Sequence, residues 1–188
     1  MSPEAPRGIV AVVSGPSGVG KTSVIDRLLE RPGYGRSITA TTRGPRGEEK
    51  DGVHYLFLPR AEFEAGLKTG RFLEHAVVYG NLYGTPRDGV EAVLARGDVC
   101  LLNIDVQGAE ALRKSGLTVV TIFILPPSME ELERRLISRG TEGEADARRR
   151  FEIAKKEVAE AGRFDFRVVN RTIEGTVDEI DGFLRARK

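Results

Sequence analysis

"GIVAVVSGPSGVGKTSVIDRLLE", residues 8–30, contains the change of pattern that decides the fold. Residues 8–15 form a short apolar run rich in β-branched side chains, which predicts a strand buried on both faces. From Lys21 onward the apolar residues recur at helical spacing until Pro32 and Gly33 end the pattern. A buried strand that enters a helix through a glycine-rich turn is typical of an α/β protein.

The same alternation continues along the chain. Apolar runs predict three further strands, at residues 98–105, 117–125 and 166–170. Helical spacing occupies four segments, at residues 86–97, 106–116, 128–140 and 145–162. Strands alternating with helices of this length predict βαβ units and a parallel sheet flanked by helices. Residues 38–83 break the rhythm with short strand-like pieces around one helix-like segment, which predicts a small inserted mixed α/β subdomain.

Composition limits the classes of function. The chain has 188 residues, 40% hydrophobic and 30% charged, which predicts one domain. Lys and Arg total 29 against 28 Asp and Glu, so the balance gives no reason to expect nucleic acid or a lipid surface as a partner. We find no apolar run near 18 residues and no leader, so we expect a cytoplasmic protein without a membrane span. As a separate expectation, the protein is a monomer or a homodimer. The lone Cys100 lies in an apolar run and predicts a buried thiol.

The turn after the first strand carries a phosphate-binding signature. Residues 15–22 fit the pattern G-x-x-x-x-G-K-[ST], with a buried strand before it and a helix after it. Such a loop turns backbone N–H groups toward an anion, and the following helix adds its positive N-terminal end. Lys21 is predicted to reach the β- and γ-phosphates of a nucleoside triphosphate, and the Thr22 hydroxyl to bind Mg²⁺. The predicted phosphate-binding residues are Gly15, Pro16, Ser17, Gly18, Val19, Gly20, Lys21, Thr22 and Ser23.

A phosphate loop of this kind works with a carboxylate at the end of a neighbouring strand, which holds Mg²⁺ or its water. Asp105 closes the apolar run at residues 98–105 and shares a face with Asn103. We therefore predict Thr22 and Asp105 as the metal ligands. The alternative role for Asp105 is to cap the helix that follows.

A second cluster points to a second anion. Arg43 and Arg46 stand three residues apart in a segment rich in glycine, proline and charge, and Tyr55 follows. Two guanidiniums and a phenol could hold one phosphate through charge-assisted hydrogen bonds. Downstream, Glu74 lies inside an apolar run, where a carboxylate needs a donor such as the N1–H and N2–H₂ groups of guanine. The alternative is that the arginines are solvated loop charges and that Glu74 protects an edge strand.

The segment "TTRGPRGEEKDGVHYLFL", residues 41–58, together with "GNLYGT", "FILPPS" and "RLISRGTE", resembles guanylate kinases along nearly the whole chain. The resemblance implies Mg²⁺-dependent transfer of phosphate from ATP to GMP, and plausibly to deoxy-GMP. It implies a core of residues 8–37, 86–138 and 163–188, a GMP-binding subdomain of residues 38–85 and a helical lid of residues 139–162. The GMP-binding residues that it implies are Thr39, Arg43, Arg46, Tyr55, Glu74, Tyr83, Thr85 and Asn103.

The resemblance also implies catalytic roles, which it assigns to Lys21, Arg43, Arg135, Arg139 and Arg150. Helical geometry independently separates these arginines from their neighbours, because Arg135 borders an apolar stripe whereas Arg134 points away. Asn170 is implied to lie near adenine. The chain departs from the family at Asn103, where an acid is usual, and at Arg171, where an acid is also common.

Two alternatives remain at the level of sequence. A guanylate-kinase-like domain can serve as a non-catalytic protein-binding module, and the phosphate loop is the feature that separates the two, because a degenerate loop favours binding alone. A kinase for another nucleoside monophosphate is the nearest enzymatic alternative, with base choice resting on Thr39, Glu74 and Thr85. A GTPase is disfavoured because the chain lacks an "NKxD"-like base-reading motif.

Overall fold

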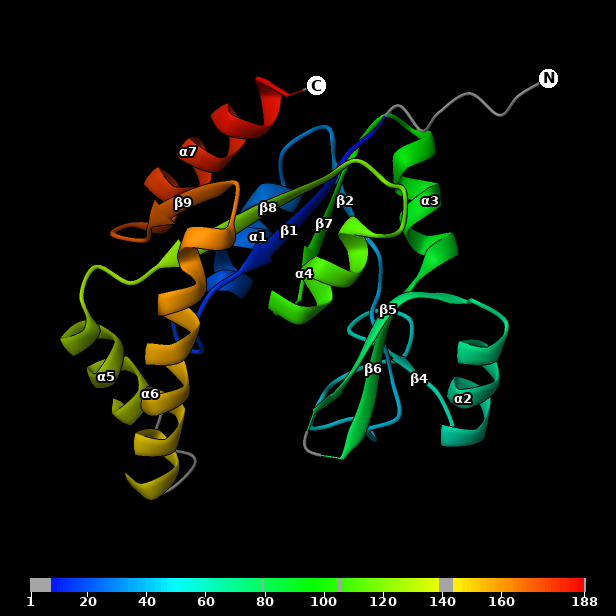
Figure 1. The fold of residues 1–188 in the computed structure, drawn as a ribbon, viewed down its shortest axis with the longest axis horizontal. Coiled ribbons are helices and arrows are strands. Elements are labelled where there is room, and N and C mark those ends of the chain that lie inside the picture. The colour runs from blue at the N-terminus through cyan, green and yellow to red at the C-terminus, as the bar shows by residue number, and fades with distance from the viewer. Residues whose placement is uncertain (1–7, 79, 105, 139–143, 188) are drawn as a thin grey trace. The chain divides into compact units, whose positions relative to one another are not determined.

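The computed structural model describes residues 8–78, 80–104, 106–138 and 144–187 (Figure 1). The strands are β1 (Val10–Ser14), β2 (Tyr34–Arg36), β3 (Ala40–Thr41), β4 (Leu56–Phe57), β5 (Phe72–Val78), β6 (Asn81–Pro86), β7 (Val99–Asn103), β8 (Val119–Leu125) and β9 (Phe166–Val169). The helices are α1 (Lys21–Leu29), α2 (Arg60–Lys68), α3 (Arg87–Ala95), α4 (Val106–Arg113), α5 (Met129–Ser138), α6 (Glu144–Ala159) and α7 (Ile173–Arg185), with the 3₁₀ turn η1 (Glu160–Arg163).

The first sheet has the strand order β2-β7-β1-β8-β9. Its outer pairs, β2 with β7 and β8 with β9, are parallel, with Gly35 opposite Cys100 and Ile124 opposite Val168. Every residue of β1 is buried, as expected of a strand covered on both faces. These features confirm the predicted α/β class and its parallel sheet.

The chain divides into two compact units. The first unit consists of a segment that ends at Val10, together with Gly33–Leu102 and Gln107–Val119. The second unit consists of Ala11–Pro32, Asn103–Val106 and Val120–Lys188. The first unit contains a second sheet of strand order β4-β3-β6-β5, in which β5 and β6 form an antiparallel hairpin and β3 pairs parallel with β4. Apart from the last residues of β6, which ends at Pro86, this sheet lies within residues 38–83, the region that the sequence predicts as an inserted subdomain.

Helix α2 closes the core of the second sheet. Phe63 of α2 is fully buried and stacks on Phe72 of β5, with ring centroids 4.3 Å apart. Ala40 and Leu82 complete this cluster. Gly84 of β6 faces the two rings, and a side chain there would lie only 2.9 Å from the Phe63 ring. The close packing of the rings against backbone therefore requires glycine at this position.

In the other unit, two small clusters hold α6 in place. Leu132 and Leu136 of α5 pack with Ala154 of α6, and Figure 1 shows the two helices side by side. Near the end of α6, Ala161 packs with Phe123 of β8 and with Phe164. The apolar positions that face α5 and β8 recur at helical spacing, as the sequence predicts.

Among the elements that the sequence did not predict are strand β2 and helix α7. Strand β2 is only three residues long and contains Gly35, so it has no clear apolar period. Helix α7 begins after Thr172, whose hydroxyl oxygen accepts a hydrogen bond from the Gly175 N–H, and it buries Val177, Ile180 and Leu184. Cys100 is buried as predicted, and burial raises the pKa of its thiol to about 11. None of the helices in the described ranges combines the length and apolar character needed to cross a bilayer.

We predict that Phe63→Ala lowers the free energy of unfolding by about 3–5 kcal/mol, because it removes a fully buried ring from its stacked partner. Urea unfolding followed by circular dichroism measures the loss. Val77→Ala is the matched control, since Val77 lies on the same sheet and is 66% exposed. Equal losses for the two variants would show that Phe63 is not a core residue.

Candidate functional site

The phosphate loop joins the end of β1 to the first residue of α1. Gly20 caps the helix in the left-handed region, at φ 100°. A β-carbon at Gly20 would also lie 2.6 Å from the Asn170 amide nitrogen, so both backbone conformation and space require glycine here. The backbone N–H groups at the start of α1 lack helical partners, which makes this end of the helix suited to an anion.

Lys21 folds back over this loop. Its amine donates hydrogen bonds to the carbonyl oxygens of Gly15, at 2.5 Å, and Pro16, at 3.0 Å. The ammonium therefore lies within the turn that the loop makes, where it would meet the phosphates of a bound nucleotide. Thr22 and Ser23 follow in the first turn of α1 and are exposed. The loop residues of the predicted phosphate site are thus brought together by one strand-to-helix junction.

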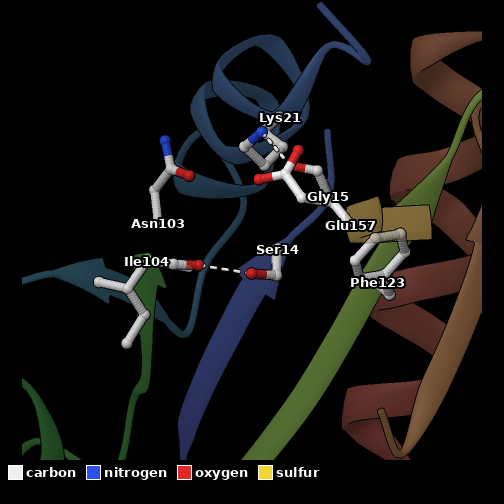
Figure 2. A pocket seen from close by; sticks show the side chains of 7 residues that line it. All are labelled: Ser14, Gly15, Lys21, Asn103, Ile104, Phe123 and Glu157. Atoms are coloured by element: carbon white, nitrogen blue, oxygen red, sulfur yellow. Dashed lines mark hydrogen bonds between the residues drawn. The ribbon is translucent and has the colours of Figure 1, made fainter. Parts of the chain in front are cut away.

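A cavity beside the loop gathers further side chains. Figure 2 shows its lining, which consists of Ser14, Gly15, Lys21, Asn103, Ile104, Phe123 and Glu157. The Ser14 hydroxyl donates a 2.5 Å hydrogen bond to the Ile104 carbonyl oxygen, which ties the end of β1 to the segment that follows β7. Asn103, predicted from the resemblance as a GMP-binding residue, lines this cavity together with Lys21. Asp105, the predicted metal ligand, lies outside the described residues.

Glu157 of α6 was not predicted as a site residue. Figure 2 shows its carboxylate directed toward the Lys21 side chain within the cavity. It stands three residues after the buried Ala154 and four before Ala161. That spacing places Glu157 on the packed face of the helix. A carboxylate on an otherwise apolar helical stripe is the signal that could have identified it.

The predicted catalytic arginines differ in where they lie. Arg135 of α5 has a side chain 33% exposed, against 77% for Arg134, which confirms the helical argument that separates the two. The Arg135 Nε donates a 2.9 Å hydrogen bond to Glu131 one turn earlier. Arg150 of α6 is half-buried, whereas the neighbouring Arg149 is exposed. Arg139 lies outside the described residues.

The second predicted anion site belongs to the unit with the smaller sheet. Arg43, just beyond β3, has a side chain only 10% exposed. Its Nε lies 3.1 Å from the Tyr83 hydroxyl oxygen, and its guanidinium carbon lies 5.3 Å from the centre of the Tyr55 ring. Tyr55 and Tyr83 meet edge to face, with centroids 6.1 Å apart. The structure therefore assembles three of the predicted acceptor-phosphate residues, and Arg43 is not a solvated loop charge.

Glu49 joins this cluster although no role was predicted for it. Both carboxylate oxygens accept hydrogen bonds from the Arg43 guanidinium, at 2.9 and 3.0 Å, and Oε2 also accepts from the Arg46 backbone N–H at 2.7 Å. The Arg43 hydrogen bond holds the pKa of Glu49 below its ordinary value, and Glu49 in turn raises the pKa of Arg43. The Arg46 side chain itself is exposed. A forked carboxylate contact of this kind is also the geometry in which a guanidinium binds phosphate.

The predicted base-binding residues include one buried pair. Glu74 on β5 is 7% exposed and lies opposite Thr85 on β6 in the sheet register. The Thr85 hydroxyl donates a 2.5 Å hydrogen bond to the Glu74 carboxylate. Thr39 precedes β3, and its backbone carbonyl accepts from the Leu56 N–H at 2.9 Å. Glu74 and Thr85 are therefore brought into direct contact, while Thr39 contributes to the pairing of β3 with β4.

Asn170, predicted near adenine, is 3% exposed. Its side-chain amide donates to the Val19 carbonyl oxygen in the phosphate loop at 2.8 Å. The structure thus places it against the loop backbone.

Comparisons with known proteins agree over nearly the whole chain. A family model described as guanylate kinase matches residues 7–187. A guanylate kinase of Clostridium perfringens strain 13 is 46% identical over 183 residues, which cover 97% of this chain and 85% of that protein. A guanylate kinase of Symbiobacterium thermophilum is 43% identical over 187 residues, covering 99% and 89%. A crystal structure of guanylate kinase from Anaplasma phagocytophilum aligns with a TM-score of 0.77 at 39% identity, covering 96% of this chain and 86% of that one.

We predict that Glu49→Gln destabilises the protein at neutral pH and that the difference from wild type closes in acid. The folded-state pKa of Glu49 lies below its ordinary value of 4.5. The ionised Glu49 therefore makes its full contribution to the free energy of unfolding at a pH above 4.5. That contribution is lost as the pH falls through the lowered folded-state pKa. Urea unfolding across a pH series measures the difference, with Glu48→Gln, an exposed neighbour, as control. A difference independent of pH would show that the Arg43 pair does not act through charge.

Proposed function

Because the chain belongs to the guanylate kinase family, we propose that it transfers the γ-phosphoryl group of ATP to GMP, forming ADP and GDP. The observation that carries this proposal is the complete phosphate loop, with the Lys21 ammonium inside the turn and the start of α1 behind it. The family match over residues 7–187 supplies the acceptor class. We also propose deoxy-GMP, which differs from GMP only at the ribose, as a second acceptor.

The donor side of the reaction rests on the loop. Backbone N–H groups between Gly15 and Thr22 bind the ATP phosphates, and Lys21 exchanges its contacts with the Gly15 and Pro16 carbonyls for phosphate oxygens. Phosphoryl transfer passes through a loose transition state, so the protein contributes mainly by orienting the reactants and offsetting charge. The acceptor phosphate of GMP is ionised at neutral pH and needs no general base.

The acceptor side rests on the cluster around Arg43. The side chains of Arg43, Arg46, Tyr55 and Tyr83 hold the phosphate of GMP, and Glu49 orients the Arg43 fork. Glu74 accepts hydrogen bonds from the N1–H and N2–H₂ groups of guanine, while Thr85 holds the carboxylate in place. Thr39 and Asn103 complete the proposed contacts to GMP. A base without two adjacent donors cannot make both of these hydrogen bonds to the buried Glu74 carboxylate.

A divalent cation fits the donor chemistry of the phosphate loop. Thr22 offers an exposed hydroxyl oxygen beside Lys21, and Asn103 offers a carboxamide oxygen in the adjacent cavity. Hard oxygen donors of this kind suit Mg²⁺, which binds through few protein ligands together with phosphate oxygens. We propose Thr22 and Asp105 as its protein ligands. When bound, Mg²⁺ would neutralise charge on the β- and γ-phosphates.

Three arginines, Arg135, Arg139 and Arg150, are proposed to offset charge on the transferring group. The proposed lid, residues 139–162, would exclude water during transfer and so prevent hydrolysis of ATP. We also propose the division into core, GMP-binding subdomain and lid at the boundaries that the sequence predicts. The non-catalytic binding module receives no support, because the phosphate loop has its lysine and hydroxyl residues in place.

The proposed function is tested by ADP release from ATP and Mg²⁺, with GMP, AMP, UMP and CMP added in turn. We expect release that depends strongly on GMP. Preference for another monophosphate would retain the kinase and overturn the guanine assignment. GMP binding without acceptor-dependent release would overturn the catalytic proposal and favour the binding module.

We predict that Lys21→Ala lowers kcat about a hundredfold or more, because it removes the positive charge nearest the transferring phosphate. Steady-state kinetics with saturating GMP measures the loss. Lys68→Ala, which removes an exposed lysine at the end of α2, is the control and should leave kcat unchanged. Near-normal turnover of Lys21→Ala would contradict the role assigned to the loop.

We predict that Glu74→Gln raises KM for GMP about tenfold or more and leaves KM for ATP unchanged, because an amide cannot accept both guanine donors as a carboxylate does. The Gln side chain can still accept the Thr85 hydroxyl, so the local fold is retained. Glu62→Gln on the exposed face of α2 is the control. An unchanged KM for GMP would remove Glu74 from the base site.

A further inference from the structure

Asn170 connects three segments of its unit through buried hydrogen bonds. Its backbone N–H donates to the Leu125 carbonyl oxygen at 2.8 Å, which fixes the residue at the end of the paired strands β8 and β9. Its side-chain nitrogen donates to the Val19 carbonyl oxygen at 2.8 Å. Its side-chain oxygen lies 3.0 Å from the Thr176 hydroxyl of α7. The carboxamide thus has protein partners at both ends.

Thr176 sets the direction of this carboxamide. It is 2% exposed, and its hydroxyl oxygen lies 2.9 Å from the Thr172 carbonyl oxygen as well as 3.0 Å from Asn170. The single hydroxyl proton of Thr176 is within reach of both acceptors, and donation to the Asn170 oxygen leaves the Asn170 nitrogen facing the phosphate loop. A residue so enclosed has little surface to offer an adenine base.

The contact with Val19 controls the peptide between Val19 and Gly20. Because a trans peptide is planar, its N–H points opposite to its carbonyl. A Val19 carbonyl held by Asn170 therefore directs the Gly20 N–H the opposite way within the same plane, away from Asn170. Gly18 and Gly20, the neighbours of Val19 in the chain, have positive φ, at 83° and 100°. Without the contact from Asn170, the backbone at these glycines would rotate easily.

We propose that Asn170 is a positioning residue for the phosphate loop: it holds the Val19 carbonyl so that the Gly20 N–H is directed to the donor phosphates. The proposal rests on the phosphate-binding function of the loop. The contact with adenine expected of Asn170 stays a separate prediction. Glycine at position 20 belongs to the same arrangement, since a β-carbon there would lie 2.6 Å from the Asn170 nitrogen.

Asn170→Asp tests the proposal, because an ionised carboxylate of similar shape cannot donate to the Val19 carbonyl. We expect KM for ATP to rise about tenfold or more, with KM for GMP within about twofold of wild type. The same rise is expected with ITP as donor, which lacks the adenine amino group, since the loop binds phosphates and not the base. An unchanged KM for ATP, or a rise confined to ATP and absent with ITP, would overturn the proposal.

A second pair of variants keeps the test informative if Asn170→Asp fails to fold. Thr176→Val removes the hydroxyl that orients Asn170, while Thr176→Ser retains it. We expect Thr176→Val to raise KM for ATP selectively and Thr176→Ser to behave as wild type. Equal kinetics for these two variants would overturn the orienting role of Thr176 and with it the proposal.

Direct binding separates this inference from the proposed reaction. If the wild-type protein releases no ADP with GMP, the proposed function fails, yet titration calorimetry with ATP still compares wild type with Asn170→Asp. We expect weaker binding of ATP by the variant, with thermal melting showing a folded protein. Equal ATP affinity of the two folded proteins would overturn the positioning role whatever the outcome for the reaction.

Discussion

The orientation of a few backbone N–H groups between β1 and α1 is the constraint on which the proposed chemistry depends. Those groups must remain without backbone acceptors and must face one small volume, which ordinary helix and strand pairing would prevent. The chain supports this arrangement by burying β1 on both faces and by starting α1 directly after a left-handed Gly20, although the Val19 N–H donates to the Pro16 carbonyl at 3.3 Å. Asn170 then holds the Val19 carbonyl and with it the peptide between Val19 and Gly20. Rigid elements on both sides hold a flexible turn in one conformation.

In the cluster around Arg43, the constraint is the near-burial of a positive charge. Arg43 is nearly buried, so its guanidinium needs acceptors before a substrate arrives. Both carboxylate oxygens of Glu49 accept hydrogen bonds from the Arg43 guanidinium. The aromatic rings of Tyr55 and Phe57 lie near the guanidinium carbon of Arg43. Arg43 is thereby held in one orientation before a substrate binds, and Glu49 offsets the cost of burying its charge. The buried Glu74 and Thr85 pair follows the same logic for a base, because a carboxylate that is already oriented loses less freedom on binding.

Local pattern predicted much of the fold and part of the site. The strands at β1, β7, β8 and β9 and the helices between them follow from apolar period alone, and the exposure of Arg134 and Arg135 follows from helical spacing. The same reasoning passed over β2, which is short and contains glycine, and α7. Glu49 was passed over because an acid in a charged loop has no distinguishing local pattern, and only its partner Arg43 marks it. Glu157 did carry a local signal, a carboxylate on the apolar stripe of α6, but only the cavity that it shares with Lys21 gives that signal a meaning.

The sequence by itself determined the α/β class, the phosphate loop and its lysine, because these depend on residue types at fixed short spacings. Only the tertiary structure decided which distant groups meet. Asn170 stands 151 residues from Val19, and no periodicity links the two. The resemblance predicts that Asn170 lies near adenine. In the structure, its contacts with the ends of β8 and β9 and with α7 hold it against the loop backbone. Hydrogen bonds between segments far apart in the chain depend on where strands and helices are packed, and that packing is a property of the whole unit.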